Sequence, residues 1–323
     1  MRGFVDATFD SAPVQGAQGA LARLVFEMRP AREWIAGLDG LMLSLALATG
    51  ALAVRRGHGR LYGLLVLLGL GIELASIHLG KTHCHAASSI ANFGKCSSVN
   101  SVLFYGPWLY LPLLCAPLLS GSVASATALL QMLFGLVYEL QGPSNGWWLF
   151  GDDLIHNGAF AGRILGAPLV AILFHPVLGF GIASMMRLVG VGMHEAPKNH
   201  TFGRLMLVVI LTLPFVAGSD LLLHVGLRMG AEKSFSVAAI TFLCFVLPIL
   251  ASTSRPIVPR SSAVDGMLIA LISFVWYAFF VLQALWHLSY QPDILLLLFT
   301  ITVAGLVLFG KSAWILMASP GKK

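Results

Sequence analysis

The residues of this chain that can do chemistry are acids and histidines near the ends of long apolar segments. Glu73 and Glu139 each lie close to the end of such a segment, and Asp220 precedes His224 by about one helical turn. A carboxylate beside an imidazole can bind a metal ion, orient a metal-bound histidine or act as an acid–base pair. Ionisable side chains in apolar segments are costly, so each is a candidate for a functional site. The candidate acid–base residues are Glu73, Glu139, Asp153 and Asp220, and the candidate metal ligands are His78, His83, His156, His175 and His224.

The densest cluster of imidazoles contains His78, His83 and His85. Three imidazoles with a carboxylate from another segment suit Zn²⁺ or non-haem iron as a cofactor. The spacing matches no zinc motif, and the histidine boxes typical of membrane di-iron desaturases and hydroxylases are absent. Two interpretations stay open for these histidines: a metal site, or polar loop residues at the level of the lipid head groups. For the acids inside apolar segments, the alternative is a buried hydrogen bond that holds helices together.

A second polar region runs from Tyr138 to His175 and contains the adjacent pair Trp147 and Trp148. Tryptophans are typical of the membrane interface, so we interpret the pair first as part of an aromatic belt. The alternative is the rim or floor of a lipid-facing pocket. Glycines recur every four residues over 158–166, which predicts a smooth helix face that permits close packing.

The composition identifies the elements that must position these residues. Of 323 residues, 57% are hydrophobic and 11% are charged, whereas a soluble protein has about 25% charged residues. This excludes most soluble classes and predicts an all-α, polytopic transmembrane helical bundle. A helix needs about 20 apolar residues to cross the hydrocarbon layer. Such runs predict about nine spans, near 38–54, 60–80, 101–119, 121–140, 160–186, 203–226, 234–252, 265–289 and 292–317.

Three regions follow from these spans. Residues 1–37 form an extramembrane segment with an amphipathic surface helix over 18–36, residues 38–317 form the membrane domain, and residues 318–323 form a short cytoplasmic tail. The net charge is +6. Because the basic residues lie in short loops, we interpret them as topology signals and expect no nucleic-acid partner.

Arginines and lysines in alternate loops predict the orientation of the chain, since cytoplasmic loops retain positive charge. They place the N-terminus outside or in a lumen and the C-terminus in the cytoplasm, in the plasma membrane or an endomembrane. Most candidate acids and histidines then meet at the outer or lumenal face. Cys84 and Cys96 fall on this oxidising side, where a disulfide can form. The sequon at Asn199 falls on the cytoplasmic side.

The second to fifth predicted spans resemble an uncharacterised family of eukaryotic multi-pass membrane proteins. In that family an acid and histidines close one span, and a later span ends in Tyr-acid, Gly and Trp-Trp, followed by Asp, Asn, Arg, Gly-x-Pro and Phe-His. The similarity covers about a third of the chain, and the His-Asp that follows the family's tryptophans is replaced here by Leu-Phe-Gly-Asp. The resemblance implies a common intramembrane site but no activity. The matching residues are Glu73, His78, His83, Tyr138, Glu139, Gly142, Trp147, Trp148, Asp153, Asn157, Arg163, Gly166, Pro168, Phe174 and His175.

The distribution of titratable residues favours one function. They gather toward one membrane face and do not form a chain across the bilayer, which favours an integral membrane enzyme of hydrolase, hydroxylase or cyclase type. Its expected partners are membrane lipids and a hydrophobic small-molecule substrate, a lipid or an isoprenoid. The sequence leaves open whether it has a cofactor; Zn or Fe would suit the histidines if they bind a metal. The alternative is a proton- or cation-coupled transporter that uses the same acids and histidines. A scaffold whose acids only hold helices together is the third hypothesis.

Overall fold

A bundle of long helices makes up most of the molecule. The structure is a computed structural model, and it describes residues 32–78, 82–85, 90–92, 96–143, 145, 147–150, 163–164, 167–193, 201–227, 231–252, 262–286 and 292–318. Nine helices lie within these described ranges. They are α2 (Arg32–Arg55), α3 (Gly59–His78), α4 (Val99–Leu119), α5 (Val123–Gln141), α7 (Leu169–Val189), α8 (Phe202–Leu227), α9 (Ala231–Ala251), α10 (Ala263–Trp286) and α11 (Pro292–Ala318).

These helices confirm the predicted fold class. Within the described residues, eight of them are long and apolar enough to cross a membrane, whereas the apolar stretch of α9, Ser236–Ala251, is shorter. The helices occur at the nine places where apolar runs predict spans. The chain is therefore an all-α bundle of the multi-pass membrane type, as its hydrophobic content requires.

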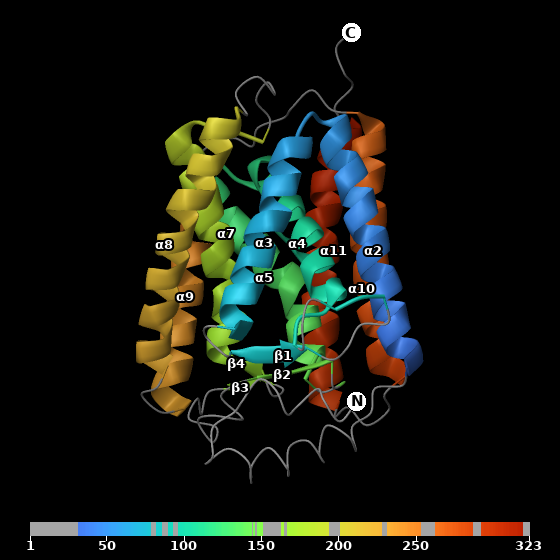
Figure 1. The fold of residues 1–323 in the computed structure, drawn as a ribbon, viewed down its shortest axis with the longest axis vertical. Helices are drawn as coiled ribbons and strands as arrows, with labels where there is room; N and C mark the ends of the chain where they lie inside the picture. The colour runs from blue at the N-terminus through green and yellow to red at the C-terminus, as the bar shows by residue number, and fades with distance from the viewer. Residues whose placement is uncertain are drawn as a thin grey trace.

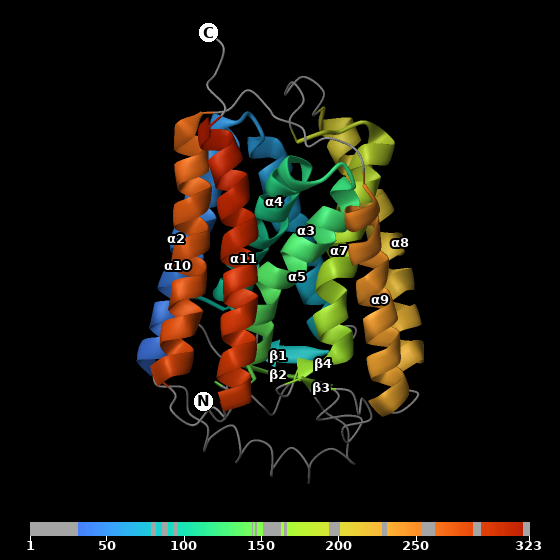
Figure 2. The same ribbon diagram turned by 180° about the vertical axis from the view of Figure 1, so that it is seen from behind.

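The bundle has a protected centre and two flanks. Helices α4 and α5 lie in the middle, α2, α10 and α11 on one flank, and α8 and α9 on the other (Figures 1 and 2). Of the apolar window of α4, 89% is buried, against 22% for α8. Side chains on α4 and α5 are thus enclosed by protein, while much of α8 presents an apolar surface suited to lipid.

Two short antiparallel ribbons join the helices at one end of the bundle, the end where α2 begins (Figure 1). Strand β1 (His83–His85) pairs with β2 (Trp148–Phe150), and β3 (Arg163–Ile164) pairs with β4 (Ala167–Pro168). The last helix, α11, ends at the opposite end of the bundle.

The fifth predicted span, 160–186, is wrong at its beginning. The described residues before Leu169 form the β3–β4 ribbon, and α7 begins only after Pro168, which has extended backbone angles. Proline disfavours a helical conformation in the residue before it, and residues 167–168 pair as strand β4 here, so α7 begins after Pro168. The predicted helical glycine face over 158–166 therefore does not extend through this ribbon, and most of that range lies outside the described residues.

The first helix extends further toward the N-terminus than the predicted span. Helix α2 is continuous from Arg32, and its membrane-length portion begins at Ile35. It therefore takes up the last residues of the predicted extramembrane segment. Residues 1–31, with most of the predicted amphipathic helix, lie outside the described residues, as does the sequon at Asn199.

Candidate functional site

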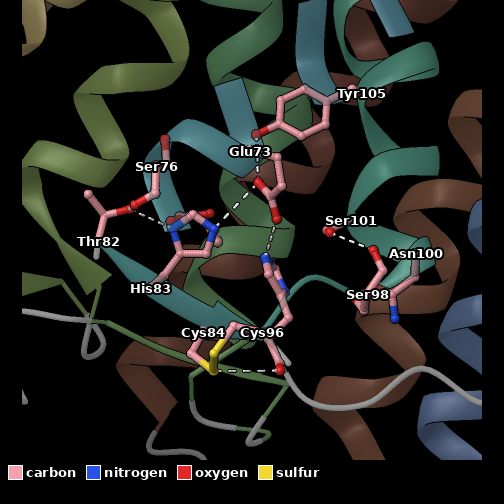
Figure 3. Close-up of polar contacts among 12 residues, drawn as sticks. Glu73, Ser76, Thr82, His83, Cys84, Cys96, Ser98, Asn100, Ser101 and Tyr105 are labelled. Atoms are coloured by element: carbon pink, nitrogen blue, oxygen red, sulfur yellow. Dashed lines mark hydrogen bonds and ion pairs between the residues drawn. A yellow bond between two sulfur atoms is a disulfide. The ribbon is translucent and has the colours of Figure 1, made fainter. Parts of the chain in front are cut away.

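The site is built where α3 ends and the β1–β2 ribbon crosses the end of the bundle. Glu73 lies in the last turns of α3, and its side chain is buried. In β1, successive side chains point to opposite faces of the strand, so His83 and His85 share one face and Cys84 takes the other. The histidine face is turned toward Glu73, as the contacts below show (Figure 3).

A disulfide fixes the other face of β1. Cys84 is bonded to Cys96, the residue pair that the sequence places on the oxidising side. The backbone N–H of His85 also donates a hydrogen bond to the carbonyl oxygen of Cys96, at 2.9 Å. Because Cys96 lies three residues before the start of α4, the disulfide ties the histidine strand to the helix that supplies the next contact (Figure 3).

Three side chains converge on the Glu73 carboxylate. His85 Nε2 lies 2.9 Å from Oε1, His83 Nε2 lies 3.4 Å from Oε2, and the Tyr105 hydroxyl of α4 donates a hydrogen bond to Oε2 at 2.9 Å (Figure 3). Glu73 and His85 are buried, and the His83 side chain is 19% exposed. A buried carboxylate needs compensating partners, and each oxygen of this one lies within 3.4 Å of an imidazole nitrogen.

Thr82 fixes the orientation of the His83 ring. Its hydroxyl lies 3.2 Å from the carbonyl oxygen of Ser76, to which it can donate, and 2.8 Å from His83 Nδ1. Because Nδ1 is hydrogen-bonded to Thr82, Nε2 is the ring nitrogen that faces Glu73.

The charges around His83 raise its pKa. Burial disfavours the charged imidazole, but the charge and hydrogen bond of the Glu73 carboxylate and the charge of Glu139 together outweigh burial. The pKa of His83 therefore lies above its ordinary value. Without another cation at the site, His83 is protonated over a wider pH range than a free imidazole.

A second acid–imidazole pair lies beside the first. His175 Nε2 of α7 lies 3.4 Å from Glu139 Oε2 of α5, and the imidazole packs edge-on against the Trp108 indole. His175 is buried, and the Glu139 side chain is 13% exposed. Because the charge of Glu139 acts on His83, the two pairs form one electrostatic unit at this end of the bundle.

Glycines on facing helices make room for the polar side chains between α5 and α7. A Cβ at Gly135 of α5 would collide with the His175 imidazole, and a Cβ at Gly179 of α7 would collide with the Gln131 amide. Each polar side chain thus fills a notch in the opposite helix. His175 Nδ1 and both polar atoms of the Gln131 amide are buried without a hydrogen-bond partner.

The tandem tryptophans line the site, and their interpretation as an exposed aromatic belt is wrong. Trp147 and Trp148 are each only 3% exposed. Strand pairing places Trp148 opposite His85, with ring centroids 5.4 Å apart, and the Trp148 ring also packs on Tyr138 at 4.4 Å. The Trp148 ring lies where a side chain at position 142 would be, so glycine is needed there. The tryptophans form an aromatic wall, because β2 folds them inward against α5.

The structure brings together four of the nine predicted site residues. Glu73 lies with His83, and Glu139 lies with His175. His78 is the last residue of α3, and Asp220 and His224 lie in α8; the structure describes their backbone and not their side chains. Asp153 and His156 lie outside the described residues.

Three contributors to this end of the bundle were missed as site residues. His85 belongs to the imidazole cluster but is not among the nine candidate residues, although its two-residue spacing from His83 is the signal that a strand provides. Tyr105 gave no sequence signal, since an apolar helix tolerates tyrosine as packing. Asp39, a buried acid of α2, met the criterion used for the other acids; its Oδ1 accepts a hydrogen bond from Asn100 Nδ2 at 2.7 Å.

Comparison of the chain with models of known protein families, with curated proteins and with solved structures finds no match. The site is therefore interpreted from its own geometry.

Proposed function

We propose that this chain is an integral membrane enzyme that acts on a lipid or isoprenoid substrate by acid–base chemistry at Glu73, His83, His85 and Tyr105. The observation that carries the proposal is the buried Glu73 carboxylate, which contacts two imidazoles and a phenol at one end of an apolar bundle. Groups of this kind, held within hydrogen-bond reach of one another, exchange protons readily. A membrane protein that needed only to hold helices together could do so with fewer ionisable groups.

The surroundings suit a hydrophobic substrate. The aromatic wall of Trp147, Trp148 and Tyr138 adjoins the acid–imidazole cluster and makes its surroundings apolar. The Tyr138 hydroxyl and the Trp147 indole N–H are buried there without partners, so they are available to orient a polar group of the substrate. Hydrolysis or hydration is the reaction class we propose, since water addition needs proton transfers and no redox partner.

The location of the site is part of the proposal. The Cys84–Cys96 disulfide supports an oxidising compartment on this side of the membrane. Helix α2 begins at the same end (Figure 1), so the N-terminus is outside or lumenal and the C-terminus cytoplasmic. We also retain the resemblance to the uncharacterised eukaryotic family as a proposal, because Glu73, His83, Glu139 and His175 are all among its matching residues.

Lipid analysis of membranes tests the function. Wild type, Glu73→Gln and a control, His58→Gln, are expressed at equal levels, and lipid extracts are compared by mass spectrometry. His58 is a suitable control because it is equally buried, contacts Tyr110 at 3.0 Å and lies between α2 and α3, away from the site. We expect wild type and the control to convert one lipid into products that account for one added water molecule, and Glu73→Gln to leave it unchanged.

The same membranes can contradict the proposal. Identical lipid profiles in all three samples would contradict the enzyme. If liposomes that contain the wild-type chain also take up a small molecule together with protons, and Glu73→Gln abolishes this uptake, the chain is a transporter instead.

A further inference from the structure

We infer that Glu73, His83 and His85 bind one divalent transition-metal ion, and that the ion is Zn²⁺. Each residue offers one ligand atom, and the three atoms lie within 4.8 Å of one another. Among the described residues, these three are the acids, histidines or cysteines whose ligand atoms lie that close together in a group of at least three. The role of the ion in catalysis rests on the proposed function, but its binding does not.

The distances already approach those of a coordination shell. Zinc bonds of about 2.0–2.1 Å in tetrahedral geometry place neighbouring ligand atoms roughly 3.3 Å apart. The imidazole nitrogens lie 2.9 Å and 3.4 Å from Glu73, one at each carboxylate oxygen, and one ligand atom from each residue falls within 4.8 Å of the other two. Rotation of the carboxylate and the imidazoles would bring one oxygen and both nitrogens around a common position for the ion.

A hydrogen-bond partner holds one of the proposed ligands in position. The Thr82 hydroxyl lies 2.8 Å from His83 Nδ1, and Nε2 is the ring nitrogen that faces Glu73. A hydrogen bond at the remote ring nitrogen is the arrangement that orients metal-bound histidines.

The donor set selects the metal. Two imidazole nitrogens and one carboxylate oxygen are unsuited to Ca²⁺ and Mg²⁺, which take oxygen ligands. The same set, with one position open for water, is that of many catalytic zinc sites. Iron(II) uses two histidines and a carboxylate with three open positions. Here Tyr105 bonds to Glu73 and the Trp148 ring packs against His85, so the space around the ligands favours the lower coordination number of zinc.

An ion in this site would supply what the proposed hydrolysis lacks, which is an activated nucleophile. Zn²⁺ lowers the pKa of a bound water molecule toward neutrality. His83 is the partly exposed ligand, with 19% of its side chain accessible. It marks the side from which the ion and water enter, while Glu73 and His85 are enclosed.

Metal analysis of the full chain, purified in detergent, tests the inference. Metal content is measured by mass spectrometry, and Zn²⁺ affinity is measured on chelator-stripped protein with a competing coloured chelator. We expect stoichiometric zinc in wild type and in His58→Gln, and at least tenfold weaker binding in Glu73→Gln and His85→Gln. Thr82→Val leaves all three ligands in place, and loss of its contact to His83 should weaken binding by about 10- to 100-fold. This variant keeps the test valid if the ligand variants fail to fold.

Two results would overturn the metal site: a wild-type chain that binds none of zinc, iron, manganese or cobalt stoichiometrically, and His85→Gln with wild-type zinc affinity. Stoichiometric iron in place of zinc would overturn the assignment of the ion. Failure of the proposed function is distinguishable from these: zinc bound through the three ligands with unchanged membrane lipids refutes the enzyme and keeps the site. Lipid conversion by a chain that takes up no metal ion refutes the site and keeps the enzyme.

Discussion

Removing the Cys84–Cys96 disulfide is expected to loosen strand β1 and weaken metal binding while the helical bundle stays folded. Cys84 lies between the two histidines of β1, and its partner lies just before α4. The bond thus restrains the strand that carries two of the three proposed ligands. The helices draw their stability from packing between their own apolar faces, so a change confined to this loop should leave them intact.

The size of the effect follows from the loop that the disulfide closes. The two cysteines are 12 residues apart, and closing a loop of that size restricts the open chain by about 3 kcal/mol. A tenfold change in an equilibrium corresponds to about 1.4 kcal/mol. If the whole restriction acts on β1, its opening becomes about 100-fold more frequent and zinc affinity falls by the same factor. Partial order in the open loop reduces the effect, so we expect a loss of about 10- to 100-fold.

Hydrogen exchange and zinc titration measure this effect separately. The variant is Cys84→Ala/Cys96→Ala, and the matched control is Cys115→Ala/Cys244→Ala, which removes the two free cysteines and keeps the disulfide. In metal-free protein, the backbone N–H of His85, which bonds to the Cys96 carbonyl, should exchange faster in the variant and not in the control. Zinc affinity should fall in parallel.

Unchanged exchange at His85 in the disulfide variant would refute the reasoning, whatever the metal result, because it would show that strand pairing alone holds β1. Faster exchange with unchanged zinc affinity would show that the ligands do not depend on an ordered strand.

Three further predictions concern packing, pH and the opposite end of the bundle. Gly135→Ala should lower the melting temperature through a clash that costs about 1–3 kcal/mol, whereas Gly63→Ala, which meets nothing within 4 Å, should be neutral or stabilising. In the metal-free chain, the pKa of His83 is raised by folding, so protonation of His83 stabilises the fold at low pH. The melting temperature should therefore fall as the pH rises above about 6.5. Bound zinc should abolish this dependence of the melting temperature on pH. Asp265→Asn removes a buried ion pair with Arg56, of 2.9 Å, and should cost about 3 kcal/mol in thermal unfolding; a melting temperature equal to that of wild type would contradict it.

The fold class could be predicted from composition because the bilayer leaves few choices. An apolar run of membrane length must be helical, since every backbone polar group has to be satisfied within the segment. The nine helices therefore lie where such runs lie. Prediction failed where that constraint ends, as at Pro168, where a two-residue ribbon precedes α7 in place of a longer helix.

The site could be predicted only in part, because the constraint that the bilayer places on apolar runs does not extend to the loops and to helix packing. Glu73, Glu139 and His175 stand out because an ionisable group in an apolar run is rare. Tyr105 and the tryptophans depend on which helices and strands pack together, which a single sequence does not encode in any local pattern. His85 was distinguishable from His78 only by assuming a strand in a chain whose composition favours helices throughout.

The β1–β2 ribbon is the feature of this bundle that most needs explaining. A helix presents residues two apart on different sides, about 200° around its axis, so it cannot direct His83 and His85 at one carboxylate. A strand presents them on one face and turns Cys84 to the other, where a disulfide can anchor it without competing for the same space. Pairing with β2 then brings Trp148 against His85. The ribbon thus holds both imidazoles of the proposed metal site against the buried acid of α3.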